Sequence, residues 1–450
     1  MKNILFKIFN YLNYDKFIKK IFIFFWILCF VPISSRLEDI YNLGSINNIR
    51  LIVPLLSVLL LSLLLIKNKN FIKEDFLIYF LFPIYTILLI LFTLTNQNID
   101  SYLNLYWGFA MLIPYLYLYI FKNKLKTLRL FLIFSLILTL IVYTFYISSF
   151  FYLFIKTHTI QHFYTLGLNH INFLNEFVIH PRSSGLSRMA LLLFFACILL
   201  LLTQKKKYFV KILIVFIIFL SVTLILFQSR TSTFIFLFLN IILSILLIFS
   251  NKLYELRIQI SIILCSIFLA TFLNYKINLN NQFSNSKNLP SSYMLGEILV
   301  KTLKRETMET NYSSGRYEIW YNIIEISKDN IFKGYGFQAD RLLIKNESAH
   351  NLYLYSLICG GLISFFFIIL ISLRASWVSF LILYITVLTN KKFDTLILIS
   401  TFITIIFLLR GFLETSYGIY SLDYLFFIVC FFINEEHYKK LFIGNFNSRK

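Results

Sequence analysis

Long apolar runs separated by shorter polar segments cover most of the 450-residue chain. Many runs reach about 18 residues or more, which is too long for strands of a soluble core. A helix needs about 20 residues to cross the hydrocarbon core of a bilayer, so the pattern predicts transmembrane helices. Twelve runs are candidate spans on this criterion, at residues 17–35, 49–66, 75–95, 103–121, 127–155, 187–203, 208–227, 231–250, 258–273, 351–373, 395–410 and 420–433.

The runs predict an all-α fold, a polytopic transmembrane bundle of about 12 spans with one large, partly helical loop on the periplasmic side. We expect about nine N-terminal spans in residues 1–273, a loop with catalytic elements in 274–349, and further spans with a short cytoplasmic tail in 350–450. Residues 376–390 are apolar but precede two lysines, so we expect a continuation of the preceding helix or a surface helix. The first run has no small-x-small cleavage site after it and is expected to remain as a span.

The composition agrees with this fold class. Hydrophobic residues make up 59% of the chain and charged residues 14%, with a mean hydropathy of +0.77. These values exclude a disordered chain and an ordinary soluble enzyme. The net charge of +21 does not indicate nucleic-acid binding, because most short basic clusters lie between apolar runs, where topology control explains them.

Lysine-rich loops set the predicted orientation. The N-terminal lysines and the basic groups at 67–73, 122–129, 205–207 and 439–440 fall on one side, which should be cytoplasmic. Parity then places segments 156–186, 228–232 and 274–349 on the opposite face, together with every histidine except His437. Chemistry is therefore expected on that face. The cysteines lie singly inside apolar runs without a CxxC motif, and we interpret them as inert thiols.

The long loop contains helical signals and ends at a histidine. Ser314 can cap a helix that extends to about Ser327, and Gly334 and Gly336 suit a tight turn. His350 stands where the loop meets the apolar run that begins at 352, with Ser348 placed to cap the new helix. A helix N-terminus favours a bound anion and keeps a nearby imidazole neutral, so His350 is a candidate general base. An interfacial histidine bonded to loop backbone is an equal alternative. Gly360 and Gly361 are interpreted as positions of close helix packing.

Three arginines on the same face, Arg182, Arg230 and Arg316, could bind a lipid-linked phosphate or pyrophosphate, because guanidinium groups bind phosphate oxygens bidentately. For any one of them, snorkelling to lipid headgroups or pairing with a loop carboxylate is the simpler interpretation. Carboxylates on this face have spacings that provide neither a paired acid and base nor a metal motif, at Glu318, Asp340, Glu347 and Glu414. We therefore predict no metal and no cofactor.

Three stretches together resemble the O-antigen ligase and polymerase superfamily. They are Gln228-Ser-Arg-Thr-Ser232, then Ser314-Gly-Arg-Tyr-Glu-Ile-Trp320 with Lys333-Gly-Tyr-Gly-Phe337, and then Ser348-Ala-His-Asn-Leu352 leading into Cys359-Gly-Gly-Leu362. The order resembles the family pattern of an arginine turn, a large periplasmic loop opening with an arginine, and an Ala-His-Asn at the next span. By pattern the likeness covers residues 183–432.

The resemblance implies a metal-independent, inverting glycosyltransferase of the bacterial inner membrane. It would use a glycan on undecaprenyl pyrophosphate as donor at the periplasmic face. Arg230, Arg316 and Arg182 would bind the pyrophosphate, and His350 would orient or deprotonate the acceptor hydroxyl. The acceptor would be the lipid A core in a ligase, the function we favour, or a second lipid-linked glycan in a polymerase. A flippase for lipid-linked glycans is a further alternative, disfavoured because the predicted spans are nearly free of charge.

Overall fold

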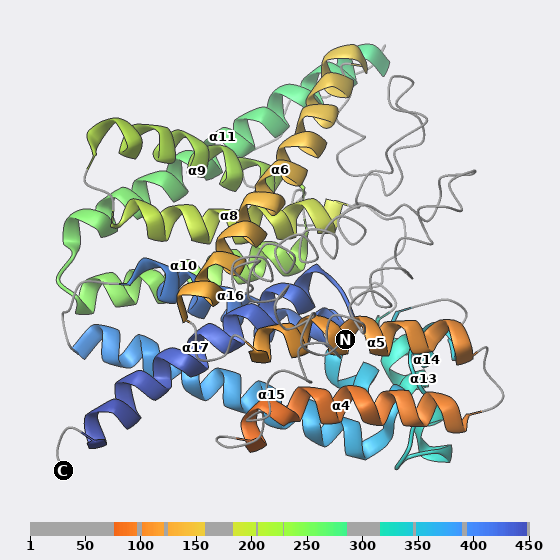
Figure 1. Ribbon diagram of the computed structural model, residues 1–450. Helices are drawn as coiled ribbons and strands as arrows, with labels where there is room; N and C mark the ends of the chain where they lie inside the picture. The colour runs from red at the N-terminus through yellow and green to blue at the C-terminus, as the bar shows by residue number, and fades with distance from the viewer. Residues whose placement is uncertain are drawn as a thin grey trace, which may run out of the picture.

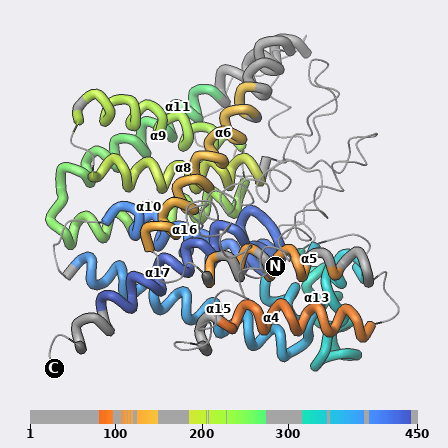
Figure 2. The backbone as a smooth tube through the Cα atoms, viewed as in Figure 1, coloured from red at the N-terminus to blue at the C-terminus, as the bar shows by residue number. Residues whose placement is uncertain are grey.

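The computed structural model describes residues 76–96, 101–120, 125–157, 183–203, 206–227, 229–285, 316–344, 348–388 and 394–447 (Figures 1 and 2). Every regular element in these ranges is a helix, which confirms the all-α prediction for them. The helices are α4 (Phe76–Thr95), α5 (Ser101–Ile120), α6 (Leu125–Thr157), α8 (Ser183–Leu201), α9 (Lys207–Leu226), α10 (Arg230–Phe249), α11 (Leu253–Asn285), α13 (Arg316–Asp329), α14 (Ala339–Leu343), α15 (Leu352–Leu388), α16 (Thr395–Gly411), the 3-10 helix η2 (Ser416–Gly418) and α17 (Leu422–Asn447).

Within the described residues, five helical segments are long and apolar enough to cross a membrane, namely Leu125–Phe145, Tyr208–Leu226, Arg230–Phe249, Leu253–Leu273 and Leu352–Val387. Three shorter apolar segments lie in α4, α8 and α16. The predicted runs 17–35 and 49–66 lie outside the described residues, so the total of twelve spans and the division at 273 and 349 stay predictions. Residues 376–388 continue α15, which decides between the two alternatives for this stretch. Helix α17 extends past the predicted end at 433.

Many hydroxyl groups inside the helices donate a hydrogen bond to a carbonyl of the same helix. Thr86 Oγ1 donates to the Phe82 carbonyl at 2.9 Å, and Thr404 Oγ1 donates to the Ser400 carbonyl at 2.8 Å. A membrane offers no water for such groups, so bonds of this kind make a polar side chain tolerable within a span. Pro83 and Pro114 lie inside α4 and α5.

The bundle is held together by an aromatic core. The Phe82 ring of α4 lies 6.0 Å from Tyr115 of α5 and 5.8 Å from Phe427 of α17, measured between centroids. Tyr417 of η2 stacks on Phe427 at 3.8 Å with an interplanar angle of 4°. Tyr417 and Phe427 are fully buried. This packing fixes the short connection between α16 and α17.

Successive helices run in alternating directions, so several helix ends gather at one end of the bundle (Figure 1). The starts of α8, α10, α15 and α17 and the end of α16 lie there, beside α13 and α14. We call this the site end. Helix α17 runs from the site end to the opposite end of the bundle (Figure 1).

Helix α15 is broken about a quarter of the way along, at its ninth and tenth residues, and a loop packs against the break. Gly360 and Gly361 have non-helical backbone angles, with φ of +62° at Gly361. The Tyr335 and Gly336 amides donate to the Ile358 and Cys359 carbonyls at 2.9 and 2.7 Å, and the Leu362 amide donates to the Ile331 carbonyl at 2.7 Å.

The predicted close helix packing is found at Gly360, where a Cβ would lie 2.7 Å from Leu89 Cδ2 of α4, whereas at Gly361 the approaching segment is the loop and not a helix. A Cβ at Gly361 would collide with the Phe332 carbonyl group. The predicted turn glycines are confirmed, with φ of +63° at Gly334 and +91° at Gly336. Together these glycines attach the loop segment to α15.

Candidate functional site

His350 lies at the site end, two residues before α15 begins. Its backbone is left-handed, with φ of +46°, and its amide lies 3.5 Å from Ser348 Oγ. The helix is capped by Asn351, whose Oδ1 accepts bonds from the Tyr353 and Leu354 amides at 2.9 and 3.0 Å. The prediction that Ser348 caps this helix was therefore wrong. Asn351 is the better cap because its side chain reaches two free amides of the first turn.

Glu414 joins His350 to Arg316. His350 Nδ1 lies 3.1 Å from Glu414 Oε2, and Arg316 NH2 lies 3.3 Å from Glu414 Oε1. The side chains are 33%, 25% and 26% exposed for His350, Glu414 and Arg316, so all three are accessible from outside. Glu414 follows α16, and its amide donates to the Arg410 carbonyl at 2.7 Å.

The surroundings favour the ionised form of Glu414. Burial opposes ionisation, but the hydrogen bond from His350 and the positive charges of Arg410, His350 and Arg316 outweigh it and lower the pKa of this carboxyl. An ionised Glu414 accepts a hydrogen bond from Nδ1–H of His350. When the His350 ring is neutral, its other nitrogen, Nε2, carries a lone pair that can accept a proton.

A second ion-pair group lies beside the first. Asp423, in the first turn of α17, binds Arg188 NH1 at 2.8 Å through Oδ1 and Arg410 Nε at 3.1 Å through Oδ2. The Asp423 and Arg410 side chains are only 2% and 7% exposed. One buried carboxylate therefore holds two guanidinium groups, from α8 and α16.

Together these residues form a charged cluster, defined as Arg188, Arg316, His350, Arg410, Glu414 and Asp423. Three guanidinium groups face two carboxylates, which leaves one positive charge without counting His350. A cluster with an excess of positive charge near the membrane surface is suited to bind an anion such as a phosphate.

Arg230, the predicted phosphate-binding residue of the short turn, is exposed at the first position of α10. Its turn is attached to α8, because Ser187 Oγ donates to Ser232 Oγ at 3.1 Å. Ser187 precedes Arg188, so the Arg230 turn lies beside the helix that carries one cluster arginine. Within the described part of the chain Arg230 makes no ion pair.

The other residues considered in the sequence lie in different places. Arg182 and Glu347 lie outside the described residues. Glu318 is exposed on α13. Asp340 is 2% exposed and its Oδ2 accepts a bond from the Ala349 amide at 2.9 Å, while burial raises the pKa of its carboxyl. We interpret Asp340 as a structural anchor for the segment before His350. Trp320 Nε1 donates to the Ala349 carbonyl at 2.9 Å and fixes the same segment to α13.

Three members of the cluster were not among the predicted site residues. Arg188, Arg410 and Asp423 stand at the ends of apolar runs, where a charge is costly unless it has a partner. A charge at the end of an apolar run was therefore the sequence signal that could have identified these three residues. Glu414 is a fourth member that was not a predicted site residue. From the sequence it was considered only as a carboxylate whose spacing gives no acid–base pair, and the structure brings it to 3.1 Å from His350.

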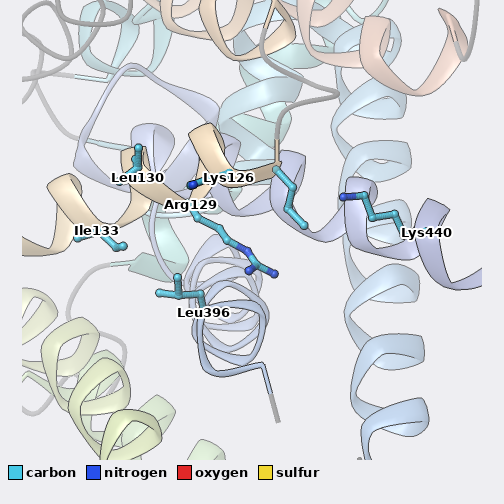
Figure 3. Close-up of a pocket in the computed structure, with 7 residues that line it drawn as sticks. Lys126, Arg129, Leu130, Ile133, Leu396 and Lys440 are labelled. Atoms are coloured by element: carbon cyan, nitrogen blue, oxygen red, sulfur yellow. The ribbon is translucent and has the colours of Figure 1, made fainter. Parts of the chain in front are cut away.

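No group of three or more potential metal ligands occurs among the residues that the structure describes, and the prediction of a metal-independent reaction stays a prediction. A cavity of about 480 Å³ lies away from the cluster, at the end of the bundle that holds Lys440 (Figure 3). Its wall includes Lys126 and Arg129, and Arg129 is ion-paired with Asp394. No cluster residue lines this cavity, so it is not part of the candidate site.

Residues 215–369 match a family model described as O-antigen ligase. The matched range contains Arg230, Arg316 and His350 and ends before Glu414 and Asp423. No curated protein and no solved structure matches the chain.

Proposed function

We propose that the chain, whose residues 215–369 match the O-antigen ligase family model, is an O-antigen ligase of the ligase and polymerase superfamily. The donor in this proposal is a glycan on undecaprenyl pyrophosphate, and the acceptor is a hydroxyl of the lipid A core. The observation that carries the proposal is the contact of Glu414 with both His350 and Arg316, which joins a potential base to a potential phosphate ligand.

The reaction is a displacement at the anomeric carbon of the donor sugar. The acceptor hydroxyl oxygen forms a bond to this carbon while the bond from carbon to the pyrophosphate oxygen breaks, and the configuration inverts. The hydroxyl proton passes to His350 Nε2, and the undecaprenyl pyrophosphate leaves with the electron pair. Glu414 stabilises the imidazolium that forms and holds the ring so that Nε2 points away from the carboxylate.

Positive charge must be available where the leaving group gains negative charge. Arg316 and Arg230 are the proposed ligands of the pyrophosphate, because both are accessible and come from elements at the site end. Arg182 remains a third proposed ligand. Guanidinium groups provide this stabilisation without a metal ion, which supports a metal-independent reaction. Arg188 and Arg410 are paired with Asp423. We propose that they contribute positive electrostatic potential at the site without binding the pyrophosphate directly.

The orientation follows the distribution of lysines. The site end lies opposite the lysine-rich C-terminal end of α17, which supports a periplasmic site in the bacterial inner membrane. A polymerase that joins two lipid-linked repeat units would use the same base and the same pyrophosphate site. The two functions differ in the acceptor alone.

Deletion in the native host, followed by separation of its lipopolysaccharide by size, tests the proposal. A ligase predicts core without O-antigen and polymer accumulating on the undecaprenyl carrier. Core capped by a single repeat would instead identify a polymerase. Complementation with His350→Ala should fail although the protein reaches the membrane, and full glycan transfer by that variant would refute the role of His350. Intact transfer combined with a transport defect would favour a flippase.

A further inference from the structure

The exposed surface of α13 is divided into two stripes of different chemistry. Residues Tyr317, Tyr321 and Ile324 follow one another at helical spacing and are 70%, 56% and 46% exposed. Ile331 and Phe332, just beyond the helix, continue this apolar stripe with exposed fractions of 39% and 65%. The neighbouring stripe is polar and exposed, and consists of Glu318, Asn322, Glu325 and Asp329. The opposite face of α13 is buried through Ile319, Ile323 and Ser327.

The apolar stripe is continuous with the outward-facing surface of α15. The Ile331 carbonyl accepts the Leu362 amide at 2.7 Å, and Leu362 is itself 39% exposed. From there the exposed apolar residues of the candidate span continue along α15, including Phe366 at 57%, Leu373 at 61% and Phe380 at 60%. An apolar surface of this length on a membrane-spanning helix faces lipid. The backbone bond between Ile331 and Leu362 thus connects the loop to a lipid-facing surface.

The length and side chains of α13 are those of a helix that lies in the membrane interface. With 14 residues it is too short to cross a bilayer, which takes about 20 residues. Two of its exposed apolar residues are tyrosines, which are enriched at the level of the lipid headgroups. Lys328 follows Ile324 along the apolar stripe, but its ammonium pairs with Glu325 at 2.6 Å and so reaches toward the polar stripe.

We propose that α13 and residues 331–332 lie in the outer-leaflet interface of the bilayer, with the apolar stripe in contact with lipid and the polar stripe in water. The occupant of the stripe is the membrane itself. Arg316 is the first residue of α13, and Trp320 holds the Ala349 carbonyl beside His350. The depth of α13 in the interface therefore sets the depth of the charged cluster. A lipid-borne pyrophosphate reaches this cluster laterally, without leaving the headgroup layer.

Photo-crosslinking of the full chain in vesicles of phosphatidylethanolamine and phosphatidylglycerol tests this placement. Benzoylphenylalanine replaces Tyr321 or Phe332 in the apolar stripe, and Asn322 or Glu325 in the polar stripe as matched controls on the same surface. Both pairs of positions are exposed, so the replacements leave the buried face of α13 intact. After irradiation, peptide mass spectrometry distinguishes adducts to lipid from adducts to protein.

We expect lipid adducts at 321 and 332 at least five times as abundant as at 322 and 325. Equal lipid labelling at all four positions would overturn the proposal, because it would mean that the stripes do not differ in environment. Adducts at 321 and 332 to another segment of this chain would also overturn it, because protein and not lipid would then cover the stripe. The experiment requires no glycan transfer, so its outcome is independent of the proposed function.

Discussion

Replacement of Glu414 by glutamine tests the proposed base most directly. The substitution keeps the size of the side chain and removes the charge that binds His350 Nδ1 at 3.1 Å and Arg316 NH2 at 3.3 Å. A positioned general base contributes about 10²–10⁴-fold to a rate, and loss of the carboxylate that orients a buried catalytic histidine costs about 10⁴-fold. Glu414 is 25% exposed, so water replaces part of the lost interaction. We therefore expect a loss near the lower end, about 100-fold in kcat, or about 2.7 kcal/mol of transition-state stabilisation.

The assay measures initial rates of the purified full-length protein with a lipid pyrophosphate-linked glycan and a core acceptor. The loss should appear in kcat more than in the KM for the acceptor, because Glu414 acts through His350 and does not itself touch the acceptor. Glu325→Gln is the matched control, since Glu325 is an exposed carboxylate that pairs with Lys328 outside the cluster. This variant should retain the parental rate.

A double-mutant cycle separates positioning from an independent effect. If Glu414 works through His350, adding Glu414→Gln to a His350→Gln protein should lower the rate by less than twofold. The reasoning is refuted if the double variant loses the product of the two single effects, because Glu414 would then act without His350. An unchanged kcat in Glu414→Gln alone would refute it as well.

Three further predictions concern stability and pH. Asp423→Asn leaves the buried Arg410 and the partly buried Arg188 without their shared carboxylate. We expect a destabilisation of about 3 kcal/mol, seen as a lowered Tm in detergent, and an unchanged Tm would contradict the paired geometry. Gly361→Ala forces a Cβ into the Phe332 carbonyl at a left-handed position, so limited proteolysis should cut the 331–336 loop faster than in the parent, and equal cutting rates would argue against the inserted loop. The pKa of Glu414 is lowered in the folded protein, so its carboxylate stabilises the fold fully above the ordinary glutamate pKa of about 4.3. This stabilisation is lost as the pH falls through the lowered pKa. The Tm difference between parent and Glu414→Gln should therefore shrink only in acid, below about pH 4.3.

The apolar pattern predicted the helices well because burial in lipid is a local property of the chain. A run of about 20 apolar residues has few alternatives to a spanning helix. Each predicted run in the described part of the chain corresponds to a helix, although α11, α15 and α17 extend well past the predicted ends at 273, 373 and 433. The break in α15 could not be predicted in this way. It depends on hydrogen bonds from Tyr335 and Gly336 to carbonyls more than 20 residues away, and Gly360 and Gly361 lie inside an unbroken apolar run.

The site could be predicted only in part, because some of its contacts join residues that are far apart in the sequence. His350 and Arg316 are marked by their places at the ends of the loop and by the family pattern. Glu414 lies 64 residues from His350 and 98 from Arg316, so its role depends on how α16 and α15 meet. Local spacing carries no information on such contacts. The left-handed backbone of His350, which places its ring outside the helix, is equally a result of the tertiary fold.

The two ion-pair groups of the cluster differ in how freely they can exchange partners. Asp423 is 2% exposed and bound on both oxygens, so separating it from Arg188 or Arg410 would leave a buried charge unpaired. Arg316 and Glu414 are about one quarter exposed and 3.3 Å apart, and an exposed pair of this kind costs little to separate. An arriving pyrophosphate can therefore recruit Arg316 while the inner group stays in place. In the proposed reaction Glu414 keeps its contact with His350 Nδ1 while Arg316 binds the leaving group, so the imidazole ring stays oriented when the acceptor proton is transferred.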